Sequence, residues 1–112
     1  MPLPGKEQTW STPRAFRRFL LDIRVIVRAA ETFHGRTKDM GEGGVGATIP
    51  GSIAGGETVE LEFQLPGMRD TMRLKAEVRY RQGFQYGFKF LHATDHQREI
   101  IRRATKNLPL AP

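Results

Sequence analysis

Three segments in the second half of the chain alternate apolar and polar residues, and this alternation restricts the fold more than any other feature. Between residues 58 and 65 every odd position is apolar and every even position is polar, which is the period of a half-buried β-strand. Residues 73–81 and 86–90 show the same period, with turn residues at 66–67 and 82–83, so the last two runs should pair as an antiparallel hairpin. The alternation directs these side chains inward: Leu74, Ala76, Val78 and Tyr80, then Tyr86, Phe88 and Phe90.

The first half is less regular. Ile23, Val25 and Val27 share one face of an extended chain, which predicts a further half-buried strand. Residues 37–56 are rich in glycine and include a proline, so we expect mainly turns there, interrupted by a short strand at 47–49.

The last segment changes to a helical period. Thr94 and Gln97 have the spacing of a capping box, and the apolar residues that follow recur on one helical face. The helix should end near Asn107, because Pro109 cannot continue it. The stripe consists of Ile100, Ile101, Ala104 and Leu108.

Several short antiparallel strands followed by one amphipathic helix predict a mainly β fold, a small barrel with the helix over an open end or edge. The 112 residues suit one domain. We assign residues 1–13 to a flexible N-terminal arm, 14–108 to the domain and 109–112 to a tail. The arm carries Trp10, a possible stacking residue.

Composition narrows the classes of protein. There is no cysteine, no apolar stretch of the roughly 20 residues that a membrane span needs and no secretory signal at the N-terminus. We therefore expect a cytoplasmic protein, as a monomer or a homodimer, without membrane insertion. The net charge of +6 favours anionic partners.

Catalytic and metal-binding patterns are lacking. No serine lies in a nucleophile elbow, and no Walker sequence is present. His92 and His96 are four residues apart, but no acidic residue or cysteine accompanies them at a familiar metal spacing. The sequence therefore predicts a protein that is not an enzyme and has no catalytic residues, no metal site and no cofactor.

Two clusters are candidates for ligand binding. Arg14, Arg17 and Arg18 lie within five residues, and a guanidinium can fork onto phosphate or onto the O6 and N7 edge of guanine. Residues 39–46 combine Asp39 with four glycines, among them Gly41 and Gly44. Glycine lets a ligand approach the backbone closely, and a carboxylate accepts hydrogen bonds from guanine N1 and N2. Together the clusters favour a guanine nucleotide.

These residues resemble the signature of the PilZ family, R-x-x-x-R followed after the first strand by (D/N)-x-(S/A)-x-x-G. Arg14 and Arg18 match the first element, and Asp39 and Gly44 match the outer positions of the second. The extended segment 19–27, the strand at 86–90 and the closing helix also agree, so the resemblance covers about residues 14–105.

The resemblance implies a six-stranded antiparallel barrel that binds cyclic di-GMP. Arg14 and Arg18 would contact guanine edges and phosphates, Asp39 would pair with a guanine Watson–Crick edge, and Arg17 is a weaker candidate. The ligand would order the arginine segment and so signal to an unidentified effector protein in trans. Gly41 departs from the signature, because serine or alanine is usual there, and a lost hydroxyl contact would weaken binding about fivefold.

Two other hypotheses remain open at this point. The chain could be a degenerate PilZ-type protein-interaction module that does not bind nucleotide, an idea prompted by Gly41. It could also bind nucleic acid without sequence specificity through its basic surface, with Trp10, Phe16 and Phe84 as stacking groups.

Overall fold

The computed structural model of the protein describes residues 16–112. The predicted arm over 1–13, with Trp10, and the candidate Arg14 lie outside the described residues. Among residues 16–112, no helix has the length and apolar character needed to span a bilayer. The elements formed by residues 16–112 are β1 (Phe19–Leu20), β2 (Arg24–Arg28), β3 (Thr32–Met40), β4 (Gly44–Thr48), β5 (Thr58–Phe63), β6 (Met72–Gln82), β7 (Gln85–Leu91) and α2 (Asp95–Thr105).

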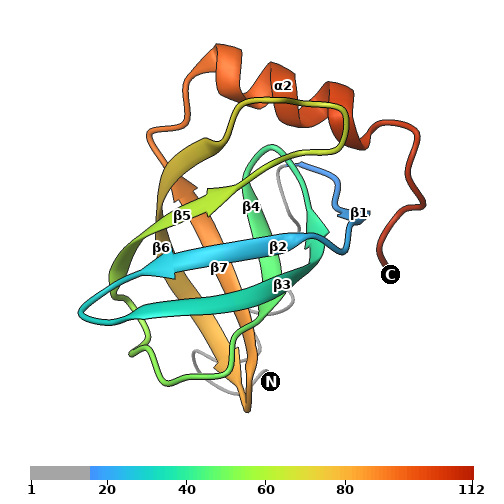
Figure 1. Ribbon diagram of the computed structural model, residues 1–112. Coiled ribbons are helices and arrows are strands. Elements are labelled where there is room, and N and C mark those ends of the chain that lie inside the picture. Colours follow the sequence, from blue (N-terminus) through green and yellow to red (C-terminus); the bar gives the residue numbers. More distant parts are fainter. Residues whose placement is uncertain (1–15) are drawn as a thin grey trace, which may run out of the picture.

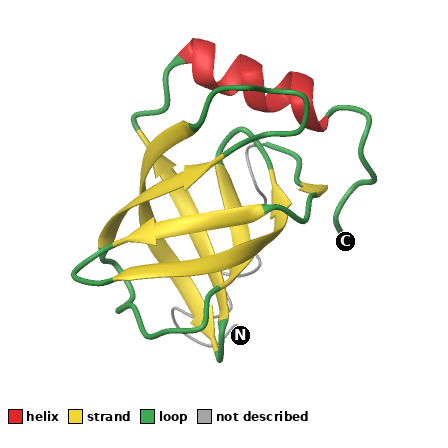
Figure 2. Ribbon diagram, viewed as in Figure 1, coloured by secondary structure: helices red, strands yellow, loops and turns green. Residues whose placement is uncertain are grey.

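The strands close into a barrel (Figure 1). Following the hydrogen-bonded neighbours, β3 pairs with β2, β2 with β5, β5 with β6, β6 with β7 and β7 with β4, always antiparallel. Strand β4 then returns to β3 and completes the ring. The short β1 is added outside the ring, on β3. The expected six-stranded antiparallel barrel is thus confirmed, and α2 lies across one end of it (Figure 2).

The barrel interior is filled by the residues that the alternation directed inward, with one exception described below. Val59, Leu61 and Phe63 of β5 are buried, as are Tyr86, Phe88 and Phe90 of β7. Helix α2 adds Ile101, which is 0% exposed, and burial of such a side chain contributes about 1.5–3 kcal/mol. The period of two therefore specified β5 and β7 and the face that each of them buries.

The predicted capping box is present at the start of α2. The Gln97 backbone N–H donates to the Thr94 hydroxyl at 3.0 Å, and the Thr94 N–H donates to the Gln97 side chain at 2.9 Å. The helix ends at Thr105, with Lys106 as its C-cap, two residues before the predicted end. Thr105 is buried and donates its hydroxyl proton to the Ile101 carbonyl at 2.8 Å.

The expected turn-rich stretch at 37–56 is wrong in its first part. Residues 32–40 form the nine-residue strand β3, and β4 occupies 44–48. Between residues 37 and 48, only residues 41–43 therefore lie outside a strand. Strand β3 pairs with β2 and with β4, and this pairing on both sides holds a segment extended although its composition favours turns.

Residues 19–27 do not form the single extended segment that the resemblance implied. Thr37 interrupts it, because its hydroxyl accepts from the Ile23 backbone N–H at 3.0 Å and donates to the Leu21 carbonyl. The chain between β1 and β2 is therefore held to β3 by this side chain as well as by two backbone hydrogen bonds, from the Leu21 N–H to the Lys38 carbonyl at 3.1 Å and from the Thr37 N–H to the Ile23 carbonyl at 2.8 Å.

Tyr80 does not point inward as predicted. The register of β6 on β7 shifts between Val78 and Tyr80, so that Val78 pairs with Phe88 but Tyr80 pairs with Gly87. The extra residue reverses the alternation, and Tyr80 stands half-buried on the outer face of the barrel.

The residues assigned to the tail lie beside β1. The Leu20 N–H donates to the Pro109 carbonyl at 2.8 Å, and the Ala111 N–H donates to the Arg18 carbonyl at 2.9 Å. Phe19 and Leu110 face each other as an isolated antiparallel bridge. The end of the chain is thus hydrogen-bonded to the end of the arginine segment.

Candidate functional site

Arg18 and Asp39 are 21 residues apart in sequence and form an ion pair in the structure. Arg18 Nη1 donates to Asp39 Oδ1 at 2.8 Å, and the two side chains are only 14% and 13% exposed. Strand β1 causes this proximity, because it pairs Leu20 with Asp39 and Phe19 with Met40. A pair shielded to this degree is screened less by salt than an exposed one.

The turn between β3 and β4 lies next to this ion pair. The Gly41 N–H donates to the Gly44 carbonyl at 2.9 Å, and the Gly43 carbonyl accepts from the Phe90 N–H at 3.0 Å. A Cβ on Gly44 would overlap the Phe88 carbonyl oxygen and lie 2.8 Å from Arg18 Nη2. Gly44 is thus needed for close packing of the arginine on the strand.

Two more glycines line the outer face of the barrel beside Asp39. The strand registers place Asp39 of β3 opposite Gly46 of β4, Gly46 opposite Gly87 of β7, and Gly87 opposite Tyr80 of β6. We call Gly44, Gly46 and Gly87 the glycine floor. All three glycines are buried in this structure, because the side chains of Arg18, Asp39 and Tyr80 lie against them. A flat ligand would approach this backbone closely where those side chains move aside.

Side chains border the glycine floor at both ends. The Asp39 carboxylate would lie 3.1 Å from a Cβ on Gly46, and the Tyr80 ring would overlap a Cβ on Gly87. Lys89 of β7 is paired with Gly44 and is exposed. The surface therefore brings a carboxylate, a guanidinium and an aromatic ring together over the glycine floor, and these groups suit a planar base with donor and acceptor edges.

The other predicted site residues take different places. Gly41 is buried and Arg17 is exposed, and it is the Arg17 backbone carbonyl that lies against Gly41. Gly46 was included among the four glycines of residues 39–46 identified from the sequence, but Gly87 was missed, and Tyr80 was directed into the core. Glycine at an outward strand position marks close approach of another group and was the available signal.

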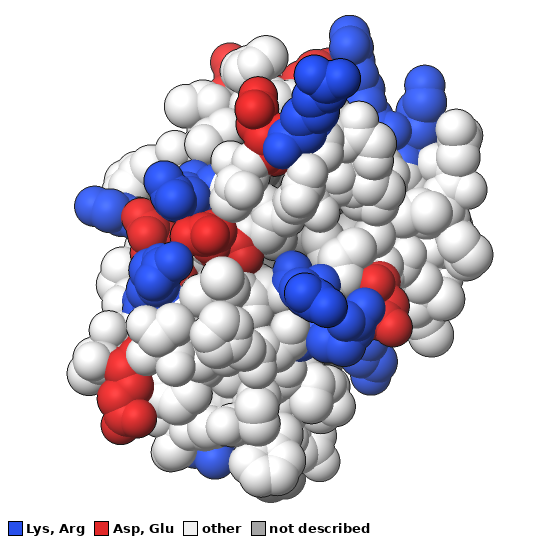
Figure 3. Space-filling model, viewed as in Figure 1, with Lys and Arg blue, Asp and Glu red and all other residues white. Residues whose placement is uncertain are grey.

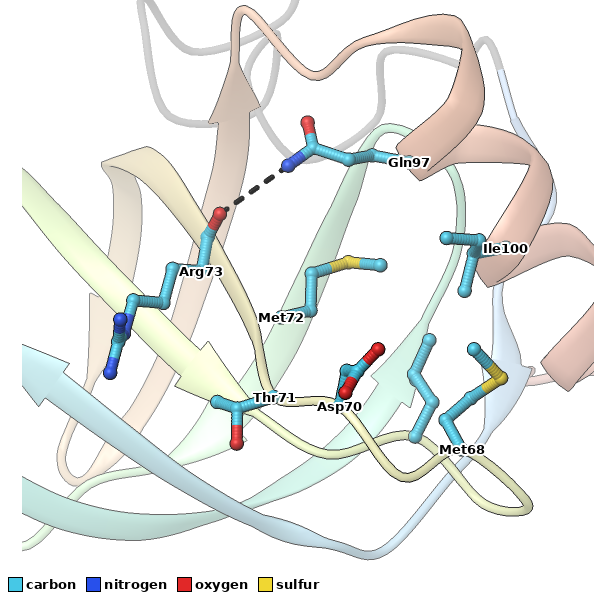
Figure 4. A pocket seen from close by; sticks show the side chains of 8 residues that line it. Met68, Asp70, Thr71, Met72, Arg73, Gln97 and Ile100 are labelled. Atoms are coloured by element: carbon cyan, nitrogen blue, oxygen red, sulfur yellow. Dashed lines mark hydrogen bonds between the residues drawn. The ribbon is translucent and has the colours of Figure 1, made fainter.

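Other regions of the described chain offer less chemistry. Within residues 16–112, no group of three or more His, Asp or Glu side chains could hold a metal ion. A hollow of about 200 Å³ lies between the β5–β6 connection and α2 (Figure 4). Its lining includes the apolar Leu65, Met72 and Ile100. Arg18, Asp39 and the glycine floor are not part of it.

Charge on the face shown in Figure 3 is mixed, with acidic side chains beside most basic ones. In the described part of the chain, Glu62 pairs with two arginines, because it accepts from Arg28 at 3.0 Å and from Arg73 at 3.2 Å. The hydrogen bond from Arg28, and then that from Arg73, lowers the pKa of Glu62. Phe84, one of the aromatic residues considered for nucleic-acid binding, is 59% exposed in the β6–β7 turn. No continuous basic stripe crosses this face.

The protein is thus a closed antiparallel β-barrel with a C-terminal helix and a candidate ligand-binding surface on its outer wall. A family model described as the PilZ domain matches residues 12–107. This chain belongs to the PilZ domain family, and the resemblance seen in the sequence is confirmed. No protein among the curated ones matches the chain.

Solved structures are similar in fold. The PilZ domain of Escherichia coli YcgR with c-di-GMP is 18% identical with a TM-score of 0.71, and the match covers 87% of this chain and 92% of that one. The PilZ domain of CeSA from a cellulose-synthesizing bacterium is 22% identical (TM-score 0.62; 78% and 93% covered). The Bacillus subtilis inhibitor of motility MotI/DgrA is 16% identical (TM-score 0.69; 82% and 49% covered).

Proposed function

We propose that this protein is a receptor for cyclic di-GMP that binds the ligand on the outer wall of its barrel. The observation that carries the proposal is the shielded Arg18–Asp39 pair at the edge of the glycine floor. Membership of the PilZ family supports it, and so does the similarity in fold to a YcgR domain whose structure contains c-di-GMP.

The chemistry of the surface matches guanine better than adenine. The Asp39 carboxylate accepts from guanine N1 and N2, which adenine cannot offer in the same pattern, and arginine donates to O6 and N7. Tyr80 at the other end of the glycine floor provides a ring against which a base can pack. Arg14 and Arg17 would add contacts to phosphates, and Gly44 would admit the ligand to the strand.

We propose further that binding is transmitted to another protein. The ligand would order the residues that precede Arg17, Arg14 among them, against the barrel and so create or hide a binding surface. The Ala111–Arg18 hydrogen bond supports such coupling, because any shift of Arg18 also reaches the end of the chain. In this account the protein works as an adaptor without catalysis, in the cytoplasm, and regulates motility or biofilm formation.

Calorimetric titration with cyclic di-GMP tests the proposal, with cyclic di-AMP and GTP as controls. We expect selective binding with a Kd of about 1 μM or lower, equivalent to about −8 kcal/mol. Arg18→Ala should abolish binding. Arg36→Ala is the matched control, because it also removes one arginine near β3 but only from an exposed pair with Asp22. Equal binding by both variants would refute the assigned role of Arg18.

A second candidate is the nucleotide-independent interaction module. The observation that favours it is that Asp39 already has a partner in Arg18 without any ligand. A pull-down that recovers the same partner with and without cyclic di-GMP, together with no heat of binding, would support this module over the receptor.

A further inference from the structure

Gly41 is packed directly beneath the arginine segment. A Cβ at this position would overlap the Arg17 carbonyl oxygen and lie 3.2 Å from both the Arg17 carbonyl carbon and Arg18 Cδ. The backbone of Gly41 is not in the left-handed region, in contrast to Gly56, Gly67 and Gly83. Space, rather than an unusual backbone conformation, is therefore what requires glycine at residue 41.

The contact between Gly41 and the Arg17 carbonyl sets the position from which the Arg18 side chain extends. With the Arg17 carbonyl seated on Gly41, Arg18 reaches Asp39 at 2.8 Å, and Arg18 Nη2 comes so near Gly44 that a Cβ there would lie 2.8 Å away. On its other side the Arg18 carbonyl accepts from the Ala111 N–H at 2.9 Å. Arg17 and Arg18 are thus held between the β3–β4 turn and the end of the chain.

We propose that Gly41 is a positioning residue, which seats the arginine segment on the β3–β4 turn and thereby assembles the Arg18–Asp39 pair before the ligand arrives. Serine, which the PilZ signature favours here, would push the Arg17 carbonyl outward and separate the pair. The departure from the signature therefore strengthens this site instead of weakening it. The part of the proposal that concerns ligand affinity rests on the proposed function.

The physical reason is preorganisation. A pair that is already assembled leaves less side-chain freedom to be lost when a ligand binds, and that saving appears as affinity. A serine hydroxyl could donate one hydrogen bond to the ligand, but it would do so in a site whose arginine and carboxylate had moved apart. The proposal therefore reverses the expectation drawn from the sequence, in which the missing hydroxyl lowered affinity.

The ligand-free test is a double-mutant cycle in urea unfolding. Arg18→Ala, Asp39→Ala and the double variant are measured with Gly41 present and again in the Gly41→Ser protein. We expect the two side chains to be coupled by about tenfold in the unfolding equilibrium constant with Gly41, and not to be coupled after Gly41→Ser. Gly55→Ser is the matched control, because a Cβ there meets no atom within 4 Å and should leave the coupling intact.

The ligand-bound test is the affinity for cyclic di-GMP. Gly41→Ser should weaken binding about tenfold, and Gly55→Ser should change it less than threefold. Failure of the wild-type protein to bind would refute the proposed function, whereas the ligand-free cycle would still decide the role of Gly41. Coupling that persists after Gly41→Ser, or affinity that stays equal or rises, would overturn the proposal.

A measurement on the wild-type protein covers the case in which Gly41→Ser does not fold. In the ligand-free protein we expect nuclear Overhauser contacts from the Gly41 α-protons to the Arg18 δ-protons, because these groups are packed together in the structure. Absence of these contacts in an assigned spectrum would mean that the arginine segment is not seated on Gly41, and the proposal would fail.

Discussion

Substitution of Gly87 by alanine should destabilise the protein through one identifiable clash. The added methyl group would overlap the Tyr80 ring, with Tyr80 Cζ 2.8 Å from the new carbon. Tyr80 is paired with Gly87 across β6 and β7, so the ring cannot avoid the methyl group without leaving its place on the sheet. An aromatic residue that covers a strand glycine in this way is a recognised means of stabilising a sheet.

The magnitude follows from two opposing terms. Forcing a methyl group into an occupied space costs about 1–3 kcal/mol, and replacing glycine by alanine in a strand returns about 0.5–1 kcal/mol. We expect a net loss of up to about 2.5 kcal/mol, which lowers Tm by up to about 10–20 °C in a domain of this size.

Urea and thermal unfolding of four proteins measure this effect: wild type, Gly87→Ala, Tyr80→Ala and the double variant. If the clash is the cause, Gly87→Ala should cost almost nothing once Tyr80 is alanine. Gly55→Ala controls for the general effect of the substitution, because a Cβ there meets no atom within 4 Å, and it should be neutral or slightly stabilising. An equal loss in both Tyr80 backgrounds would refute the reasoning.

Two further predictions concern the chain end and a surface ion pair. Deletion of residues 109–112 removes two backbone hydrogen bonds to the arginine segment and β1 and should lower the free energy of unfolding by about 1–3 kcal/mol; unchanged urea unfolding would show that these bonds contribute nothing. Arg28 and Arg73 lower the pKa of Glu62 below its ordinary value of 4.5, so the stability this carboxylate provides is complete above that pH and is lost as pH falls through the lowered value. The difference in Tm between wild type and Glu62→Gln should therefore be present at pH 7 and shrink below about pH 4.5, and a difference independent of pH would contradict this assignment.

Much of the fold could be predicted from local pattern. The alternation in 58–65 and 86–90 identified β5 and β7 with the faces they bury, and the capping box identified the start of α2. These signals are local, because burial of one face imposes a period on the residues of a single element. Strand β3 escaped prediction because its extended form comes from partners on both sides, which its own composition does not reveal.

The candidate site was predictable only in part. The motif residues Arg18 and Asp39 were identified from the sequence, and the structure brings them into contact. Gly46, Gly87 and Tyr80 come from three different strands and are neighbours only through the registers of β4, β7 and β6. No spacing along the chain records such a row.

The sequence by itself determined that the chain folds as a small barrel with a capped terminal helix, and it identified candidate residues for binding a guanine nucleotide. Tertiary structure alone decided that Tyr80 faces outward, because a single shift of register reverses every side chain beyond it. It also decided that Gly41 supports the arginine segment, since that contact joins residues 24 positions apart along the chain. Residue types carry the chemistry, whereas pairing between distant strands determines which of these residues meet.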